Sequence, residues 1–206
     1  MSVKLESSLT DLMTSLAVVF ILLMVAMINN VGQAGKSDIT KIQEILKNNQ
    51  IDCIIRADDP LACTLTVSED RLKFESGEFY INEAGGNYLK AEFPKIMKVL
   101  MEKDRKSNIS GVFIEGYTDT SRPKDCGPES NLELSQRRSL TVGLYLLNNV
   151  FQTNEKYKNA LLQWLYLNGR GEQNPKETDE LSRRVEITIK VKSFAQRNKK
   201  EIQSAI

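Results

Sequence analysis

The feature that most constrains this chain is an uncharged apolar run near its start. Residues 12–28 read LMTSLAVVFILLMVAMI and contain no charged side chain. A helix of about 20 apolar residues is needed to cross a hydrocarbon core of roughly 30 Å. We therefore predict a membrane-spanning helix over residues 11–31, preceded by a short leader over residues 1–10.

The main alternative to a retained helix is a cleaved signal peptide. Signal peptides also combine a short polar start with an apolar stretch, but they end in a pattern of small residues where cleavage occurs. Residues 29–33, NNVGQ, offer no convincing pattern of that kind. The sequence therefore favours a helix that stays in the membrane.

The whole-chain composition argues against several classes of function. The 206 residues carry 28 basic and 27 acidic side chains, so a net charge of +1 provides no field that would attract nucleic acid. Histidine is absent, which removes the commonest general base and the commonest metal ligand. We expect no nucleic-acid partner, no metal or cofactor, and no enzymatic activity.

Beyond the apolar run, the chain is expected to form a tether over residues 32–60. Within it, Ile39, Ile42, Ile45 and Leu46 recur at helical spacing, which favours a short amphipathic helix. The alternative is a solvated spacer without a buried face.

Residues 61–192 show the pattern of a globular domain, and residues 193–206 form a polar, basic tail that is expected to fray. The strand-like segments are 64–74, 112–114 and 185–191, and the helix-like segments are 88–103 and 134–149. Segment 161–167 is apolar and could be of either type. Gly85-Gly86 is expected to break the chain. Alternating strands and helices predict an α/β layered fold.

Two of the three cysteines lie close together in the sequence. Cys53 and Cys63 flank a turn-rich stretch that includes Pro60, and we expect them to form a disulfide. Two reduced thiols would be the better interpretation if this segment faced the cytosol. Cys126 lies in a polar loop and receives no role.

Four short motifs follow one another in the second half of the chain. They are GYTD at residues 116–119, NLELSQRR at residues 131–138, GRGEQNP at residues 169–175 and RRVEI at residues 183–187. Together and in this order they resemble the OmpA/MotB family of peptidoglycan-binding domains over about residues 61–192. The resemblance implies an OmpA-C-like domain in the periplasm, a cytoplasmic N-terminus, and a single pass through a bacterial inner membrane, where a disulfide is permitted.

The ligand that the resemblance implies is the zwitterionic end of diaminopimelate in the peptidoglycan stem peptide. Asp119 would accept hydrogen bonds from its ammonium, and Arg138 would hold its carboxylate through a planar pair of donors. Thr118 and Asn131 are expected as supporting hydrogen-bonding groups, and Arg184 is expected near the same pocket. The alternative is a buried ion pair between Asp119 and Arg138 that binds no ligand.

The sequence departs from the family pattern at two places. The loop over residues 120–130 is longer than usual and contains Cys126, and Ser182 stands where the family commonly has Asn before the two arginines. The loop conformation bears on access to the pocket, and Ser182 bears on the local hydrogen bonds.

Asp11 begins the apolar run, and Thr14 and Ser15 follow it at the third and fourth positions, on the same helix face. Residues 9–16, LTDLMTSL, resemble the start of the membrane helix in MotB-type stator subunits, where the acid binds protons. The resemblance implies that Asp11 carries protons and that Thr14 and Ser15 line the path. The alternative is structural, because Ser8 and Asp11 also fit a helix-capping pattern.

A membrane acid joined to a wall-binding domain implies a stator subunit of a rotary membrane motor. The implied partners are a second copy of this chain, a multi-span membrane protein of the MotA or ZorA type that forms a ring around the pair, and peptidoglycan. We favour the Zorya anti-phage defence motor, because the leader is short and not basic. A flagellar stator and a passive membrane-to-wall anchor are the alternatives, and protons are the expected coupling ion, with sodium as the other candidate.

Overall fold

The computed structural model describes residues 2–67, 71–72, 74, 77–121, 127–193 and 196–197, with side chains left undescribed at 2–9, 28–34 and 128. Its elements in chain order are α1 (Ser2–Asn48), β1 (Ile54–Arg56), β2 (Asp59–Val67), α2 (Glu83–Leu100), α3 (Lys103–Lys106), β3 (Ile109–Gly116), α4 (Pro128–Tyr145), the π-helix η1 (Leu146–Val150), α5 (Glu155–Trp164), β4 (Leu165–Gly169), α6 (Asp179–Ser182) and β5 (Val185–Val191). This is the mixed α/β fold expected from the sequence.

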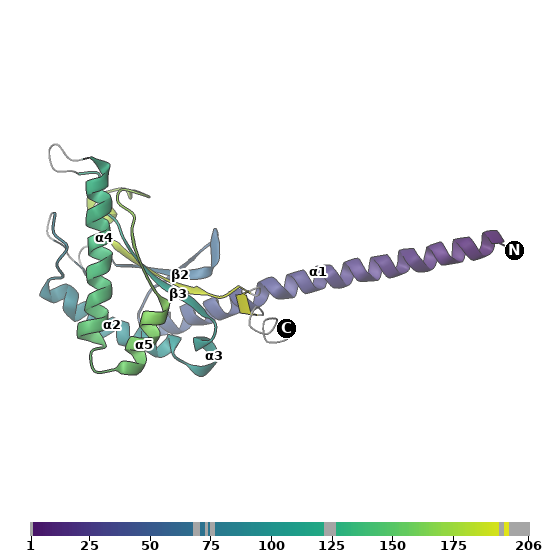
Figure 1. Cartoon of the computed structure of the whole chain (residues 1–206), viewed down its shortest axis with the longest axis horizontal. Helices are drawn as coiled ribbons and strands as arrows, with labels where there is room; N and C mark the ends of the chain where they lie inside the picture. The colour runs from purple at the N-terminus through teal and green to yellow at the C-terminus, as the bar shows by residue number, and fades with distance from the viewer. Residues whose placement is uncertain are drawn as a thin grey trace.

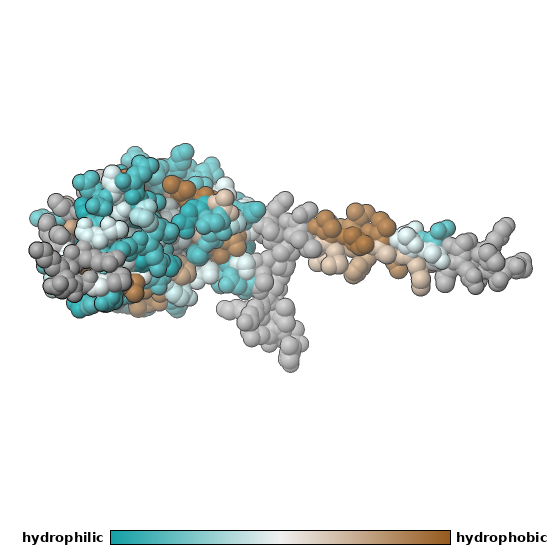
Figure 2. All heavy atoms as spheres, turned by 90° about the horizontal axis from the view of Figure 1, so that it is seen from above, coloured by the Kyte–Doolittle hydropathy of each residue, from teal (hydrophilic) through white to brown (hydrophobic). Residues whose placement is uncertain are grey.

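Helix α1 is continuous over its 47 residues and extends well beyond the rest of the molecule (Figure 1). Its stretch Thr10–Met27 is long and apolar enough to cross a membrane, and every residue of that stretch is exposed. In Figure 2 this part of α1 forms a brown apolar band outside the mainly hydrophilic globular domain. The band is what a lipid-facing segment requires.

The last turns of α1 belong to the globular domain. Ile39, Ile42 and Leu46 are buried in the core, as their helical spacing predicts for one apolar face. In the same part of α1, Asp38 forms an ion pair with Arg197 at 3.0 Å and accepts a hydrogen bond from Asn108 at 2.9 Å. The part of residues 32–60 that was expected to be a tether is therefore helical up to Asn48 and packed on the domain.

The five strands form one sheet in the order β1-β2-β5-β3-β4. Strand β5 lies between β2 and β3 and is antiparallel to both, whereas β3 and β4 are parallel. Because residues alternate between the two faces of a strand, Ile114 and Ile187 pair on the face that forms the core, while Phe113 and Thr188 pair on the opposite face.

Helix α2 begins earlier than its sequence pattern indicated. Gly85 and Gly86, which were expected to break the chain, lie in its first turn, and Asn82 caps this turn by accepting a hydrogen bond from Gly85 N at 2.8 Å. A Cβ at Gly86 would collide with the Tyr145 hydroxyl. These glycines therefore permit close packing of the helix start and do not end an element.

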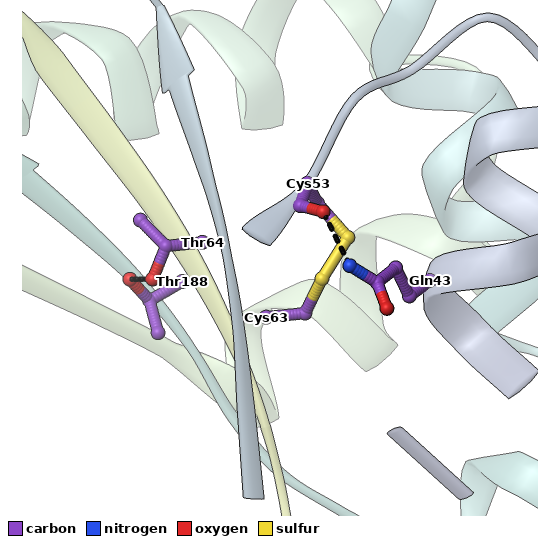
Figure 3. Close-up of a disulfide and its surroundings, with 5 residues drawn as sticks. All are labelled: Gln43, Cys53, Cys63, Thr64 and Thr188. Atoms are coloured by element: carbon purple, nitrogen blue, oxygen red, sulfur yellow. Dashed lines mark hydrogen bonds between the residues drawn. A yellow bond between two sulfur atoms is a disulfide. The ribbon is translucent and has the colours of Figure 1, made fainter. Parts of the chain in front are cut away.

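The predicted disulfide is confirmed. Cys53 and Cys63 are bonded, with 5.7 Å between their Cα atoms, and join the segment before β1 to β2 (Figure 3). Gln43 on α1 donates a hydrogen bond from Nε2 to Cys53 O at 2.8 Å. The disulfide therefore lies where α1 meets the sheet.

Candidate functional site

Three loops that carry residues of the GYTD, GRGEQNP and RRVEI motifs meet at one edge of the sheet. The carboxyl ends of the parallel strands β3 and β4 lie beside the amino end of the antiparallel β5, so strand direction alone brings the loops together. Backbone hydrogen bonds join them: Tyr117 N donates to Arg184 O at 2.9 Å, Thr118 N to Gly171 O at 2.8 Å, and Arg170 N to Gly116 O at 2.9 Å. The edge is a fixed backbone frame for side chains.

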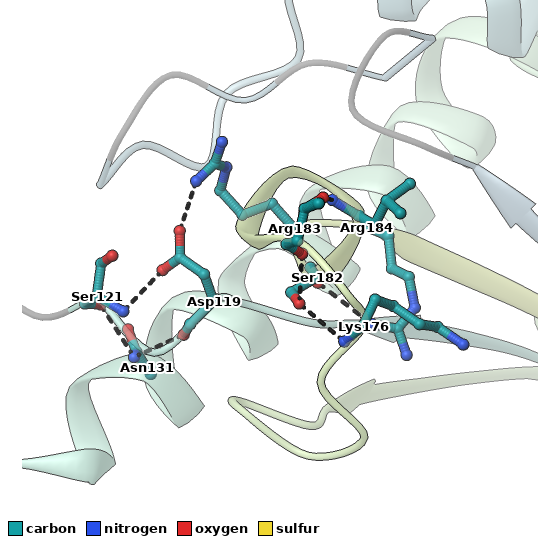
Figure 4. Close-up of polar contacts among 9 residues, drawn as sticks. Asp119, Ser121, Asn131, Lys176, Ser182, Arg183 and Arg184 are labelled. Atoms are coloured by element: carbon teal, nitrogen blue, oxygen red, sulfur yellow. Dashed lines mark hydrogen bonds and ion pairs between the residues drawn. The ribbon is translucent and has the colours of Figure 1, made fainter.

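Asp119 lies directly after this frame and is 8% exposed. Its Oδ1 accepts a hydrogen bond from Ser121 N at 3.0 Å, and its Oδ2 accepts one from Arg183 Nη1 at 2.6 Å (Figure 4). Both carboxylate oxygens therefore have a donor in this state. A carboxylate held by a backbone amide and a guanidinium has a fixed orientation, in which its oxygens can accept further donors.

Asn131 connects Asp119 to helix α4. Its side-chain nitrogen donates towards Asp119 O and Ser121 O, both at 3.1 Å, and towards Glu172 Oε1 at 2.9 Å. Three acceptors therefore surround one amide group that has two protons. Asn131 is 3% exposed, so it acts from beneath the turn and orients the backbone of Asp119.

Thr118 is the group at this edge that suggests a ligand most directly. It is 4% exposed, and its Oγ1 has no hydrogen-bond partner within the described part of the chain. A buried hydroxyl without a partner is costly in free energy and calls for a specific explanation. A polar ligand group beside Asp119 would supply the missing partner.

Arg138 lies two turns after Asn131 on α4 and is 3% exposed. Its Nε donates to Glu78 O at 3.0 Å, and its guanidinium lies 5.0 Å from the centre of the Phe74 ring. Burial beneath Phe74 and the Glu78 backbone fixes the orientation of this cation.

The two neighbouring arginines before β5 have different positions. Arg183 pairs with Asp119, whereas Arg184 is directed away from Asp119 (Figure 4) and donates from Nε to Glu186 Oε1 at 2.7 Å. The sequence motifs predicted Arg184 near the pocket and did not single out Arg183. Period-two alternation in the RRVEI strand was the available signal, because it places Arg184 on the same face as Glu186.

Arg184 belongs to a buried charged cluster behind the site. Its guanidinium lies 3.8 Å from the centre of the Tyr117 ring, and Glu115 accepts a hydrogen bond from Arg170 Nε at 2.9 Å. Burial of the phenol, together with the charges of Glu186 and Glu115, raises the pKa of Tyr117 to about 12. The hydrogen bond to Glu115 raises the pKa of Arg170.

Two small residues allow α4 to approach the strand ends closely. A Cβ at Gly116 would collide with Ser135 O, so only glycine fits there. Ser135 Oγ donates to Leu132 O and accepts from Gly171 N, both at 2.8 Å. Ser182 similarly accepts from Lys176 N at 3.0 Å and donates to Thr178 O at 2.9 Å, so this departure from the family pattern is accommodated locally.

The candidate proton-carrying residues lie far from this edge, on the projecting part of α1. Asp11, Thr14 and Ser15 are helical and exposed, and Thr14 Oγ1 donates to Thr10 O at 2.7 Å. Cys126 and most of its loop, residues 122–126, lie outside the described residues. Among the described residues, no group of three or more His, Cys, Asp or Glu side chains is arranged to hold a metal ion.

Comparison with known proteins gives a family and a fold. A sequence model described as "OmpA family" matches residues 73–188. A relative from Escherichia coli O139:H28 (strain E24377A / ETEC), named Zorya protein ZorB, is 28% identical over 196 residues, which are 88% of this chain and 78% of the relative. The crystal structure of a MotB-like protein from Desulfovibrio vulgaris has the same fold, with a TM-score of 0.53, 18% identity, and coverage of 80% of this chain and 98% of that one.

Proposed function

Because this chain belongs to the OmpA family, we propose that it is a peptidoglycan-anchored stator subunit of a proton-driven rotary membrane motor, with its domain in the periplasm of a bacterium and one helix in the inner membrane. The observation that carries the wall-binding part is the buried Asp119 beside the Thr118 hydroxyl, which has no hydrogen-bond partner among the described residues, at the loop-bearing edge of the sheet. The motor part rests on the sequence around Asp11 and on the name of the E. coli relative.

The proposed ligand is the zwitterionic end of diaminopimelate in the stem peptide. Its ammonium would donate to Asp119, in competition with or beside Arg183, and to the Thr118 hydroxyl. Its carboxylate would accept hydrogen bonds from Arg138, whose planar guanidinium matches two carboxylate oxygens better than a lysine would. Asn131 would hold the turn that carries Asp119.

Wall binding is tested by sedimenting the detergent-solubilised full chain with purified peptidoglycan. A hydrogen bond to a charged group contributes about 1.5–3 kcal/mol, so Asp119→Asn and Arg138→Lys should each weaken binding by roughly 10- to 100-fold. Asp179→Asn is the control, because Asp179 is an exposed acid in α6. Wild-type binding by a folded Asp119→Asn variant would remove Asp119 from the site.

Asp11 is proposed to carry protons across the apolar part of the membrane, with Thr14 and Ser15 on the same helix face as polar neighbours. One helix offers no aqueous path, so two copies of this chain would be surrounded by multi-span subunits of the MotA or ZorA type. Peptidoglycan would hold the pair still and provide the reaction torque.

The matched test replaces Asp11 with Asn in cells that also make the multi-span partner. The variant should reach the membrane and bind peptidoglycan as the wild type does, but lose proton flux and motor output. Met13→Ala is the control for a change in the same turn on another face of the helix. Normal motor output from the Asp11→Asn chain would make Asp11 a helix cap and the protein a passive anchor.

A defence role is preferred over swimming because of the relative named Zorya protein ZorB. Co-purification from membranes through a C-terminal tag, followed by mass spectrometry, should recover a multi-span partner in excess over this chain. Deletion of this chain should lower resistance to phage plating and leave motility unchanged. Loss of motility with unchanged resistance would assign it to a flagellar stator.

A further inference from the structure

The chain between Gly77 and α2 runs beside α4 (Figure 1). Residues of this segment, of the last turns of α4 and of η1 line an open hollow. This open hollow has a volume of about 320 Å³, within the range of pockets that bind small ligands. Its lining combines two phenol rings, two amides, a hydroxyl and aliphatic surface: Tyr80, Ile81, Thr141, Leu144, Tyr145, Asn148 and Asn149. None of these residues belongs to the site around Asp119.

Tyr80, an exposed member of this lining, lies on a segment that is held at both ends. Its ring is 67% exposed and lies 4.5 Å from the Phe79 ring, which in turn lies 5.2 Å from the Arg137 guanidinium. Before it, Glu78 O accepts the hydrogen bond from Arg138, and after it, Asn82 caps α2. A backbone that is already held in place loses little conformational freedom when a ligand binds to its side chains.

The amides in the lining belong to the π-helix η1, which continues α4. Asn148 and Asn149 are both exposed there, and each side chain offers two donors and an acceptor. An exposed aromatic face beside amides and a hydroxyl suits a ring that has apolar C–H faces and hydroxyl or acetamido edges. That chemistry is the chemistry of an N-acetylated amino sugar.

We propose that this hollow is a glycan subsite that binds an amino sugar of the peptidoglycan strand whose stem peptide occupies the Asp119 site. Tyr80 would stack on the sugar ring, Asn148 and Asn149 would bond its hydroxyl and acetamido groups, and Leu144 would contact the acetyl methyl. The proposal rests on the proposed wall-binding function and extends it from the peptide to the sugar.

The spacing along α4 agrees with this assignment. Arg138 and Tyr145 are seven residues, or two turns, apart on α4 and therefore lie on one side of that helix, and Asn149 follows in η1. At 1.5 Å per residue, Tyr145 is about 10 Å along the axis of α4 from Arg138. Two residues of a stem peptide link diaminopimelate to the sugar, and they span roughly 7 Å when extended. The diaminopimelate side chain and the lactyl group lengthen this link further, so it can reach from Arg138 to the hollow.

The test compares two probes on the detergent-solubilised full chain: a tripeptide ending in diaminopimelate, and the same tripeptide attached to its disaccharide. The wild type should bind the disaccharide form about five- to tenfold more tightly, the gain expected from an aromatic contact with its hydrogen bonds. Tyr80→Ala should bind the two probes with equal affinity, because it loses the gain from the sugar and keeps the affinity for the bare tripeptide. Tyr80→Phe should keep most of it, and Tyr166→Ala is the control, because Tyr166 is an exposed tyrosine stacked on Phe113 of the sheet.

The results distinguish failure of the proposed glycan subsite from failure of the proposed peptide site around Asp119. Equal wild-type affinity for the two probes, or an unchanged ratio in Tyr80→Ala, overturns the glycan subsite and leaves peptide binding intact. Failure of the wild type to bind either probe overturns the wall-binding function, and the subsite with it. Loss of the ratio in Tyr80→Ala with unchanged tripeptide affinity supports the subsite.

Discussion

At the scale of single residues, Tyr117 shows how burial changes the chemistry of a motif side chain. Its phenol is packed against the Arg184 guanidinium, and both burial and the nearby carboxylates of Glu186 and Glu115 disfavour the phenolate. The ring therefore acts as a neutral platform beneath the loops at the site. An ionised Tyr117 would bring a third negative charge into this cluster.

This shift predicts a pH dependence of stability with a definite sign. The folded-state pKa of Tyr117, about 12, lies above the value near 10 of an unfolded chain, so the unfolded state loses the proton first. The free energy of unfolding should therefore fall by about 1.4 kcal/mol per pH unit between pH 10 and pH 12 through this residue.

Urea unfolding at pH 9, 10 and 11 measures the effect. Tyr117→Phe should lack this part of the decline, while Tyr166→Phe, which alters an exposed tyrosine, should behave as the wild type does. Parallel curves for the wild type and Tyr117→Phe would show that Tyr117 ionises equally in both states.

At the scale of elements, the end of α1 is part of the domain core. Ile42 has no exposed surface and lies between Ile39 and Leu46 on the buried face. Gln43 links the same turns to the Cys53–Cys63 disulfide through Cys53 O. A helix attached by packing, a polar contact and a nearby disulfide behaves as a layer of the fold.

Truncation of the Ile42 side chain should therefore lower the free energy of unfolding as much as a similar truncation in any other core element. We expect Ile42→Ala to lower the free energy of unfolding by about 2–5 kcal/mol, because it deletes buried methyl groups and leaves a cavity. Lys41→Ala is the matched control at the neighbouring exposed position and should change it by less than about 0.5 kcal/mol. A small effect of Ile42→Ala in thermal or urea unfolding would mean that α1 is not docked in solution.

At the scale of the whole molecule, one continuous helix joins the apolar span to the domain. The globular part packs on residues near the end of α1, and the apolar band lies at some distance from it (Figure 2). The proposed stator function requires the membrane helix to be held relative to the wall. A docked helix meets that need more directly than a flexible tether.

Helix continuity predicts a single long distance across α1. Spin labels at Thr14 and Thr40, both exposed, are separated by 26 residues and should be about 39 Å apart at 1.5 Å per residue. Pulsed electron paramagnetic resonance on the detergent-solubilised chain should give one narrow distribution near that value. A broad distribution at shorter distances would show a break between the span and the domain.

The sequence by itself determined the features that depend on residues close to one another in the chain. The apolar run predicted the span, the spacing of Ile39, Ile42 and Leu46 predicted an apolar helix face, and the order of the four motifs predicted the family and its α/β fold. The nearby cysteines predicted the disulfide. Such patterns can be recognised without coordinates because helix period, strand alternation and turn residues act over a few residues.

Only the tertiary structure decided which distant groups meet. Asp119 pairs with Arg183, 64 residues away, because β5 runs antiparallel beside β3 and brings the two loops to one edge. Successive side chains of β5 point to opposite faces, so Arg184 instead contacts Glu186 and the Tyr117 ring. The docking of α1 likewise depends on the sheet and α2 being in place, since an apolar helix face does not specify the surface that covers it.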